Sequence, residues 1–339
     1  MIFIATDAQF CWATGPKHPK NEAEMMLPGP TRFFWRPCVK AMRASVGLSA
    51  AALLSLWCLL CGLAAAQPAA QQRPEVLTLP LTIDGTVYQV VTHIYKPQGA
   101  GPFPLVIFSH GRAPLQADRD KLQYPVLVGH ANYWLRKGVA VVAPVRPGYG
   151  ETGGSDRENS AARWSGSTCT TDPDFTKVGR NASEVVVAVH GWAIQQPWVH
   201  KDRILLEGQS VGGLTTVAAS VLNLPGVLAS VNFAGGAGGY PAVSPGKSCK
   251  PENLTKTYAA FGKLVKIPSL WLYAENDQFW GADAPRRWHA AFSAGGSDTM
   301  LIQTGPLPDH DGHALLTYGG KLWSVPLDAF VRKTGLLEP

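Results

Sequence analysis

The sequence predicts a three-layer α/β domain, in which helices cover both faces of a mostly parallel β-sheet. Short apolar runs alternate along the chain with longer segments of helical character, as expected for strands joined by helical crossovers. The runs are too uniformly apolar to alternate between buried and exposed side chains, which indicates a sheet buried on both faces. Residues 75–339 contain neither an internal repeat nor a low-complexity linker, so we expect a single domain.

The predicted domain opens with a β-hairpin over residues 75–96, where two alternating runs flank Asp84-Gly85. The expected strands of the main sheet are residues 104–109, 139–143, 203–207, 227–233, 268–274 and 299–303. The expected helices are residues 119–136, 178–195, 211–222, 251–265, 284–293 and 322–333. Residues 148–174 are rich in Gly, Ser, Thr and Asp without clear periodicity, which predicts a long functional loop.

The segment 42–66 has the features of a secretory signal peptide. A basic residue precedes a strongly apolar stretch at 46–63, and three alanines end the segment before polar residues follow. We expect cleavage after Ala66; an uncleaved membrane anchor is the alternative, because about 20 apolar residues can span a bilayer. Residues 1–41 lack helical or strand periodicity and are interpreted as a mis-called or disordered extension, which leaves 67–339 as the mature domain.

Removal of the first 66 residues changes both the charge and the cysteine count. The whole chain has 30 Lys and Arg, 24 Asp and Glu and six Cys, whereas residues 67–339 keep 24 basic residues, 21 acidic residues, Cys169 and Cys249. A net charge of about +3 without a Lys/Arg cluster does not support a nucleic-acid partner. Two cysteines in an exported chain, periplasmic or secreted, predict one disulfide between two loops, with two free thiols as the alternative.

Ser210 lies in Gly208-Gln209-Ser210-Val211-Gly212, a G-x-S-x-G sequence that joins the predicted strand 203–207 to the predicted helix 211–222. This context is typical of the nucleophile elbow, a sharp turn that exposes a serine hydroxyl at a helix N-terminus. The two glycines are needed because larger side chains would clash in so tight a turn. We predict that Ser210 is a nucleophile; the alternative is a glycine-rich turn that only packs a helix on a strand.

A nucleophilic serine requires an oxyanion hole, which two backbone N–H groups can form. The first is expected from Val211, the residue after the serine, and the second from the loop that follows the strand 104–109. We assign the second role to the N–H of Arg112, with Gly111 as the alternative. His110 in the same loop is interpreted as a structural residue that hydrogen-bonds and shapes the loop, in preference to a catalytic base.

A serine hydroxyl is a weak nucleophile near neutral pH, so a histidine must accept its proton and a carboxylate must orient that histidine. In this topology the carboxylate follows a later strand, and the histidine lies in a loop beyond it. Asp277 is the predicted acid, and Glu275 is either its support or the acid itself. His313 is the predicted base because its small neighbours leave room for the imidazole, and His310 is the alternative.

Other chemistries are less well supported by the sequence. Residues 309–313 hold two His and two Asp, which could ligate Zn²⁺, but the serine and the acid already explain why a histidine is needed there. The glycine-rich run 235–239 leads to Tyr-Pro rather than into a helix, so it does not predict a dinucleotide loop. We predict neither a metal nor a cofactor.

Taken together, these segments resemble the α/β-hydrolase superfamily, and most closely exported bacterial proteins described as dienelactone-hydrolase-like. The resemblance spans residues 75–332. The residues that carry it are Phe108-Ser109-His110-Gly111-Arg112, Arg146-Pro147-Gly148-Tyr149-Gly150, Gly208-Gln209-Ser210-Val211-Gly212-Gly213, Tyr273-Ala274-Glu275-Asn276-Asp277 and Asp311-Gly312-His313. The resemblance implies an eight-stranded α/β-hydrolase fold and a triad of Ser210, Asp277 and His313. Dienelactone hydrolases use a cysteine nucleophile, so the serine here points to the wider class of carboxylic esters.

We therefore expect a serine hydrolase that cleaves a small-molecule carboxylic ester through an acyl-enzyme, without stable membrane association after signal cleavage. Two alternatives stay open. The same serine elbow resembles the catalytic domains of prolyl-oligopeptidase-type peptidases, and a paired amide and ester assay separates the two activities. A non-catalytic binding protein on the same fold would fail to react with a fluorophosphonate probe, which labels an activated serine.

Overall fold

The computed structural model describes residues 73–338, all of which belong to one compact unit. The predicted extension 1–41 and the predicted signal peptide 42–66 lie outside the described residues. Within the described part of the chain, no helix combines the length and the apolarity needed to span a bilayer.

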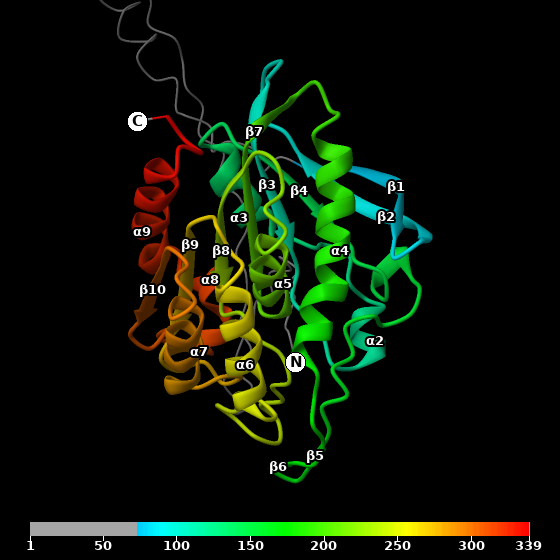
Figure 1. Cartoon of the computed structure of the whole chain (residues 1–339). Helices are drawn as coiled ribbons and strands as arrows, with labels where there is room; N and C mark the ends of the chain where they lie inside the picture. Colours follow the sequence, from blue (N-terminus) through cyan, green and yellow to red (C-terminus); the bar gives the residue numbers. More distant parts are fainter. Residues whose placement is uncertain (1–72, 339) are drawn as a thin grey trace, which may run out of the picture. The chain divides into compact units, whose positions relative to one another are not determined.

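An eight-stranded sheet forms the centre of this unit, with the order β1-β2-β4-β3-β7-β8-β9-β10 (Figure 1). The strands are β1 (Glu75–Ile83), β2 (Thr86–Tyr95), β3 (Phe103–Ser109), β4 (Ala140–Pro144), β7 (Val199–Gln209), β8 (Val227–Phe233), β9 (Ser269–Ala274) and β10 (Thr299–Thr304). The β1–β2 and β2–β4 pairs are antiparallel, and every other pair in this sheet is parallel. The predicted opening hairpin and the mostly parallel sheet are confirmed.

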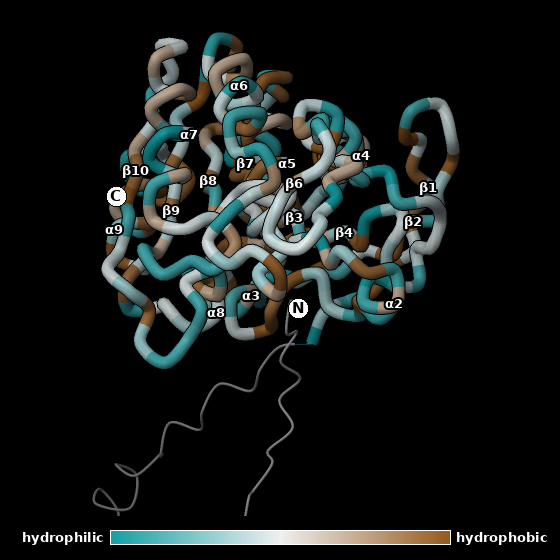
Figure 2. The backbone as a smooth tube through the Cα atoms, turned by 90° about the horizontal axis from the view of Figure 1, so that it is seen from below, coloured by the Kyte–Doolittle hydropathy of each residue, from teal (hydrophilic) through white to brown (hydrophobic). Residues whose placement is uncertain are grey.

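Helices cover both faces of the sheet, so the predicted three layers are confirmed (Figure 1). One face carries α3 (Val128–Leu135), α8 (Leu315–Tyr318) and α9 (Gly320–Lys333). The other face carries α4 (Phe175–Ala193), α5 (Val211–Ser220), α6 (Pro251–Gly262) and α7 (Asp283–Ser293). In Figure 2, polar and apolar residues alternate along helices such as α6 and α7, as expected for helices with one exposed side. Helix α5 differs, because all ten of its residues are buried.

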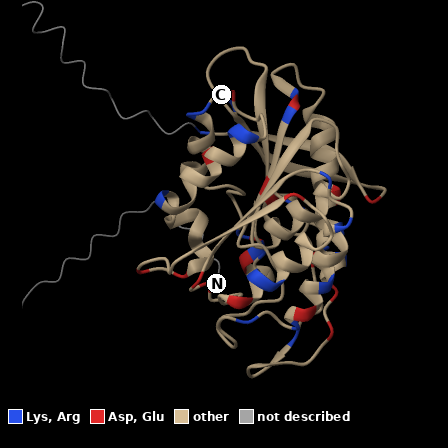
Figure 3. Ribbon diagram, turned by 60° about the vertical axis from the view of Figure 1, so that its left-hand side comes forward, with Lys and Arg blue, Asp and Glu red and all other residues tan. Residues whose placement is uncertain are grey.

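Charged side chains follow the same layering. Figure 3 shows the Lys, Arg, Asp and Glu residues mainly on the helices and loops, while the central strands are mostly free of them. The inner strands β3 and β4 consist almost entirely of buried apolar residues. This distribution explains why the sequence of the strands lacks the period-two alternation of a half-exposed sheet.

The prediction of one helix over residues 119–136 is wrong. The structure has a short helix α2 (Gln116–Arg119), then an irregular stretch, and only then α3 (Val128–Leu135). Pro125 lies in the stretch between them. Proline has no backbone N–H to donate and disfavours a helical conformation of the residue before it, so Pro125 disfavours a continuous helix at this position.

The predicted long loop contains only short elements, namely η1 (Gly150–Thr152) and the small hairpin of β5 (Trp164–Ser165) and β6 (Thr168–Cys169). We call residues 153–172 the pocket-wall segment. Cys169 at its end is disulfide-bonded to Cys249, with a Cα–Cα distance of 5.1 Å, so the predicted bridge is present. The bridge ties the segment to the loop that precedes α6.

Candidate active site

Ser210 occupies the sharp turn between β7 and α5, with φ of 59° and ψ of −124°. A positive φ is costly for a residue with a side chain and is maintained only where the surroundings enforce it. Here the enforcement comes from the backbone: the N–H of Ser210 donates to the carbonyl of Phe233 at 2.9 Å, and its carbonyl accepts from Leu214 and Gly236, both at 3.1 Å. The serine is thus held in the elbow conformation by the neighbouring strand β8 and by its own helix.

The two glycines of the elbow are sterically required. A Cβ on Gly208 would lie 2.3 Å from the carbonyl oxygen of Gly212, and one on Gly212 would lie 1.9 Å from the carbonyl oxygen of Ser109. The second approach also brings the end of β3 against the first turn of α5. We call residues 109–112, the last residue of β3 and the three that follow it, the oxyanion loop after the proposed role of Arg112.

The two proposed oxyanion donors border one cavity together with the serine. Val211 is the first residue of α5, and the amides of the first helical turn have no acceptor within the helix. Ser210, Val211 and Arg112 all line a cavity of about 490 Å³. Its other walls come from the pocket-wall segment, from residues 237–240 and from the aromatic side chains of Phe279 and Trp280.

Asp277 and His313 are in direct contact. Asp277 lies in the turn after β9, and its Oδ2 is 3.0 Å from Nδ1 of His313. Its Oδ1 accepts from the amides of Phe279 at 2.7 Å and Trp280 at 3.1 Å, so both carboxylate oxygens are occupied. A carboxylate that faces Nδ1 holds the proton there and leaves Nε2 free to act as a base.

The ring of His313 is packed between aromatic side chains. Phe279 stacks on it with a centroid distance of 4.0 Å, and Trp280 approaches edge-on at 5.4 Å. Nε2 of His313 is buried and has no hydrogen-bond partner among residues 73–338. No hydrogen bond joins it to Ser210 within these described residues; such catalytic contacts often tighten only when substrate is bound.

The alternatives from the sequence lie in different surroundings. Glu275 faces outward, where its Oε1 is 3.1 Å from the guanidinium of Arg286 and both side chains are about half exposed. His310 is exposed and stacks on Tyr318 with a centroid distance of 3.8 Å. Neither side chain contacts the pair of Asp277 and His313, so the structure brings together the acid and the base that the sequence analysis preferred.

Two residues that the sequence analysis gave no role hold the turns of Asp277 and His313 together. Asn276 donates to the carbonyls of Leu307 at 3.1 Å and His310 at 2.9 Å. Asp311 accepts through Oδ1 from the amide of His313 at 2.9 Å, at the start of η2 (Gly312–Ala314). Both are short polar side chains in tight turns, which is the only signal in the sequence that could have found them.

Gly312 is the point where these two turns touch. A Cβ at this position would lie 2.6 Å from the amide nitrogen of Asp277 and at the same distance from Oδ1 of Asn276. Any larger residue would therefore push His313 away from Asp277. The small size of Gly312, which was expected to leave room for the imidazole of His313, is therefore needed to let the turn of Asp277 approach.

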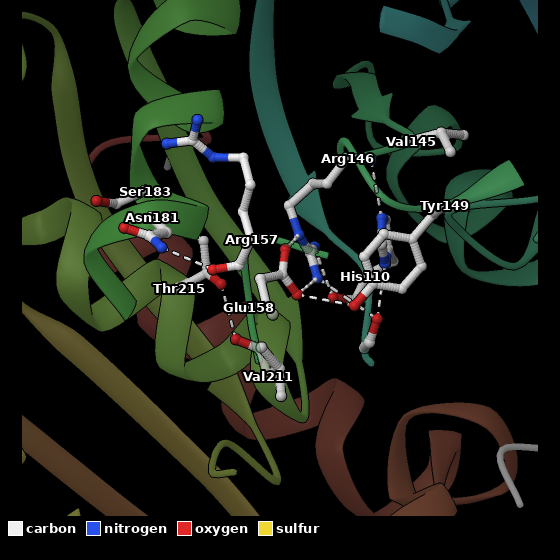
Figure 4. A network of polar contacts seen from close by, with 12 residues as sticks. His110, Val145, Arg146, Tyr149, Arg157, Glu158, Asn181, Ser183, Val211 and Thr215 are labelled. Atoms are coloured by element: carbon white, nitrogen blue, oxygen red, sulfur yellow. Dashed lines mark hydrogen bonds and ion pairs between the residues drawn. The ribbon is translucent and has the colours of Figure 1, made fainter. Parts of the chain in front are cut away.

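A buried polar network holds the oxyanion loop in place (Figure 4). Nδ1 of His110 contacts the carbonyl of Gly111 at 2.7 Å, and its Nε2 accepts from the amide of Arg146 at 3.1 Å. The guanidinium of Arg146 donates to the carbonyl of His110 at 2.7 Å and is paired with Glu158, whose Oε2 also accepts from the hydroxyl of Tyr149 at 2.8 Å. His110 therefore shapes the loop, as expected, and does not face the serine as a base.

Burial and charge fix the protonation states in this network. Burial and the neighbouring charge of Arg146 hold the pKa of His110 well below its ordinary value of 6.5, so the ring is neutral. Burial acts to lower the pKa of Arg146, but the charge and hydrogen bonds of Glu158 and Tyr149 together outweigh it and raise that pKa. Burial, followed by the charge of Glu158, raises the pKa of Tyr149 well above its ordinary value.

The side chain of Arg112 lies at one end of the cavity. It is paired with Asp156 of the pocket-wall segment, and Arg119 approaches the same carboxylate at 3.5 Å. No group of three or more His, Cys, Asp or Glu side chains among residues 73–338 is arranged to hold a metal ion. Ser210 lines this cavity, and the His313 ring of the pair with Asp277 packs against two of its aromatic wall residues, Phe279 and Trp280.

Comparison of the sequence with known protein families gave no match, and no curated protein matches it. Solved structures do match. A puromycin hydrolase superposes with a TM-score of 0.56 and 17% sequence identity, over 80% of this chain and 41% of the hydrolase. A puromycin-hydrolyzing peptidase of Mycobacterium tuberculosis superposes with a TM-score of 0.52 and 16% identity, over 82% of this chain and 42% of the peptidase. A butyrate-bound thermophilic esterase of Thermogutta terrifontis superposes with a TM-score of 0.50 and 14% identity, over 80% of this chain and 97% of the esterase.

These similarities establish the fold. The chain has the α/β-hydrolase fold, with the eight-stranded sheet and the elbow at the end of β7 that the resemblance implied. It spans about two fifths of the length of the puromycin-cleaving proteins and nearly all of the esterase. At identities of 14–17% the comparison assigns no substrate.

Proposed function

We propose that this protein is an exported serine hydrolase that cleaves small carboxylic esters with Ser210 as nucleophile, His313 as base and Asp277 as the acid that orients the base. The observations that carry the proposal are a strained elbow serine that lines the cavity and a buried histidine–aspartate pair held next to it. The side chain of Gln209, the residue before the serine, donates to the carbonyl of His313 at 2.9 Å, and the ring of His313 packs on Phe279 and Trp280 of the cavity wall. Export is supported by the Cys169–Cys249 disulfide, because such bridges persist mainly in oxidising compartments.

The reaction proceeds by acyl transfer. Nε2 of His313 takes the proton of the Ser210 hydroxyl as its oxygen attacks the ester carbonyl, and the N–H groups of Val211 and Arg112 bind the oxygen that becomes negative. The tetrahedral intermediate collapses to an acyl-enzyme, and His313 returns the proton to the departing alkoxide. Water, deprotonated by His313, then attacks the acyl-enzyme, which releases the carboxylic acid and restores the serine.

A peptidase is the second candidate, because the puromycin hydrolase superposes with a higher TM-score than the esterase. Two observations favour the ester. The match to the esterase extends over 97% of that chain but over only 41–42% of the puromycin-cleaving proteins. The cavity of about 490 Å³ is walled by the protein's own pocket-wall segment, which suits a small substrate better than an extended peptide.

The decisive experiment compares the mature protein with Ser210→Ala on p-nitrophenyl acetate. We expect the substitution to lower kcat by about 10³-fold or more, because the nucleophile and its base act as a unit. A fluorophosphonate probe should label the wild type on Ser210, located by peptide mapping, and leave the variant unlabelled. A paired aminoacyl p-nitroanilide and the corresponding ester then measure the preference for amide or ester.

The outcomes separate the candidates. An unchanged rate in Ser210→Ala would reject the catalytic assignment. A clear preference for the anilide over its ester would replace the esterase by a peptidase with the same machinery. Absence of probe labelling in the wild type, together with no turnover, would leave a binding protein on a hydrolase fold.

A further inference from the structure

Arg146 is a buried cation that the proposed reaction does not use. Its side chain is 1% exposed, and it does not belong to the described residues that line the cavity. Burying a guanidinium is expensive unless its charge is paired and its N–H groups are satisfied. The guanidinium of Arg146 makes contacts with the carbonyls of the oxyanion loop, which indicates that its role is to hold that loop.

The carbonyl of Gly111 and the N–H of Arg112 belong to the same peptide group. A planar trans peptide directs these two groups to opposite sides, so whatever holds the carbonyl also sets the direction of the N–H. The carbonyl of Gly111 accepts from Nδ1 of His110 at 2.7 Å and from Nη2 of Arg146 at 3.4 Å. The direction of the proposed oxyanion donor, the N–H of Arg112, is therefore set by the side chains of His110 and Arg146 on the opposite side of the peptide.

Arg146 also fixes the tautomer that this arrangement needs. Its amide N–H donates to Nε2 of His110 at 3.1 Å, so the proton of the neutral ring must be on Nδ1, where it can be donated to Gly111. Its Nη1 donates to the carbonyl of His110 at 2.7 Å, which fixes the preceding peptide as well. One arginine thus controls two successive carbonyls and one ring of the oxyanion loop (Figure 4).

Glu158 supplies the counter-charge for Arg146. Its two oxygens lie 2.5 Å from Nε and 3.0 Å from Nη2 of Arg146, and the hydroxyl of Tyr149 donates to it at 2.8 Å. The side-on pairing leaves Nη1 for the carbonyl of His110. Glu158 belongs to the pocket-wall segment, so the same ion pair joins that wall to the oxyanion loop.

We propose that Arg146 is a positioning residue for oxyanion stabilisation: through His110 and the carbonyl of Gly111 it orients the Gly111–Arg112 peptide so that its N–H faces the reacting carbonyl. This inference rests on the proposed hydrolase function. An interaction that matters mainly when negative charge develops should change kcat much more than KM.

The test compares Arg146→Lys with Arg203→Lys in the mature protein, with p-nitrophenyl acetate as substrate. Lysine can pair with Glu158 but lacks the planar fork that reaches the carbonyls as well. Arg203 is the control, since it also pairs with a glutamate, Glu338, but lies near the start of β7, at the end of the strand away from Ser210. We expect kcat to fall about 10- to 100-fold in Arg146→Lys with KM within about threefold, and both to stay within about twofold in Arg203→Lys.

Two further readouts separate positioning from simple loss of stability. An alkyl boronic acid forms a tetrahedral adduct with an activated serine, and its affinity should weaken in Arg146→Lys by about the same factor as kcat. In Arg146→Ala, added guanidinium at non-denaturing concentration should recover about fivefold or more of the lost kcat, whereas methylammonium should not. Both measurements are accompanied by the melting temperature of each variant.

The results that overturn the inference differ from those that overturn the function. A wild-type rate no higher than that of Ser210→Ala would remove the proposed function and this inference with it. A normal wild-type rate with an unchanged kcat in Arg146→Lys would overturn the inference alone. Equal losses in the two lysine variants, or a kcat loss without weaker boronate binding, would also overturn it.

Discussion

The two sides of the cavity are built in different ways. On one side stand three turns that we call the catalytic turns after their proposed roles. The elbow at 208–213 and the turn of Asp277 contribute lining residues, and the turn of His313 packs against the second through Phe279; each begins at or near the end of a strand. On the other side stands the pocket-wall segment, twenty residues long, whose sheet structure is a hairpin of two two-residue strands and an isolated bridge from Gly153 to Tyr149. Backbone hydrogen bonds, close glycine contacts and the short side chains of Asn276 and Asp311 hold the first side.

The second side depends on side chains. The pocket-wall segment is held by the Arg146–Glu158 pair, by Arg157 with Glu184 of α4, and by the Cys169–Cys249 disulfide. Short strand-to-helix turns leave few conformations to lose on folding, whereas a long irregular segment must be ordered by added contacts. Chemistry that needs sub-ångström placement therefore lies on the turns, and the segment shapes the space in front of them.

The largest expected effect tests the catalytic turns. In Asp277→Asn the amide oxygen can still accept from Phe279 and Trp280, but the amide nitrogen then faces Nδ1 of His313. His313 would be left with its proton on Nε2, where it cannot act as a base, so we expect kcat to fall by about 10³- to 10⁴-fold. Steady-state kinetics on p-nitrophenyl acetate measure the loss.

Glu275→Gln is the matched control for that substitution, because Glu275 is the other carboxylate of the same turn and pairs only with the exposed Arg286 among the described residues. We expect its kcat to stay within about twofold of the wild type, as is usual for an exposed ion pair. A large loss in Glu275→Gln with activity retained in Asp277→Asn would reverse the assignment of the acid.

An intermediate effect tests the pocket wall. The disulfide closes a loop with a sequence separation of 80 residues. Removing a bridge of this kind costs about 2–4 kcal/mol, so replacing Cys169 and Cys249 together by serine should lower the free energy of unfolding by that amount. Urea denaturation of the two proteins measures the difference.

The same double variant should still react with the fluorophosphonate probe at Ser210 under native conditions, because no contact of the catalytic turns runs through either cysteine among the contacts described. Loss of labelling in protein that remains folded would show that the two sides of the cavity are not independent. An unchanged free energy of unfolding would show that the segment is ordered without its bridge.

The sequence predicted the arrangement of the side of the cavity that consists of motifs. The strand β8 has the predicted bounds, Ser210 lies in the predicted turn, and Asp277 and His313 are in contact, each chosen by its position after a strand or in the loop beyond it. The choice between Asp277 and Glu275 depended on which side chain faces the sheet edge. That direction is set by a turn of a few residues, and composition carries no information about it.

For the side formed by the pocket-wall segment, the sequence predicts only a loop. The sequence marked residues 148–174 as functional and paired the two cysteines, but nothing in it connects Arg146 to Glu158, twelve positions apart in a segment without periodicity. Charged residues are expected at the surface, so a buried ion pair contradicts the usual expectation. The break of the predicted helix is different, because Pro125 is itself a sequence signal against a helix, although the apolar pattern around it favours one.

The smallest expected effect is the pH dependence of stability, and it arises where the two sides meet. His110 contacts Arg146 and the oxyanion loop, and burial with the charge of Arg146 holds its pKa well below the ordinary value of 6.5. Below pH 6.5 His110 binds a proton in the unfolded chain but not in the folded protein. The free energy of unfolding is therefore unaffected by this histidine above about pH 7.5 and falls as the solution is acidified through 6.5. Each such histidine contributes a slope of up to about 1.4 kcal/mol per pH unit.

His110→Gln removes this titration while it keeps an acceptor for the amide of Arg146. Urea denaturation at several pH values between 7.5 and 5 should therefore show a shallower loss of stability in the variant than in the wild type. His289 on α7, whose pKa burial also lowers, gives the comparison away from the cavity, and His289→Gln should flatten the curve less, because the pKa of His110 is the more strongly displaced. If His110→Gln kept the wild-type slope, folding would not lower the pKa of His110. Its ring would then be protonated in the folded protein below about pH 6.5, where its Nε2 could not accept from the amide of Arg146.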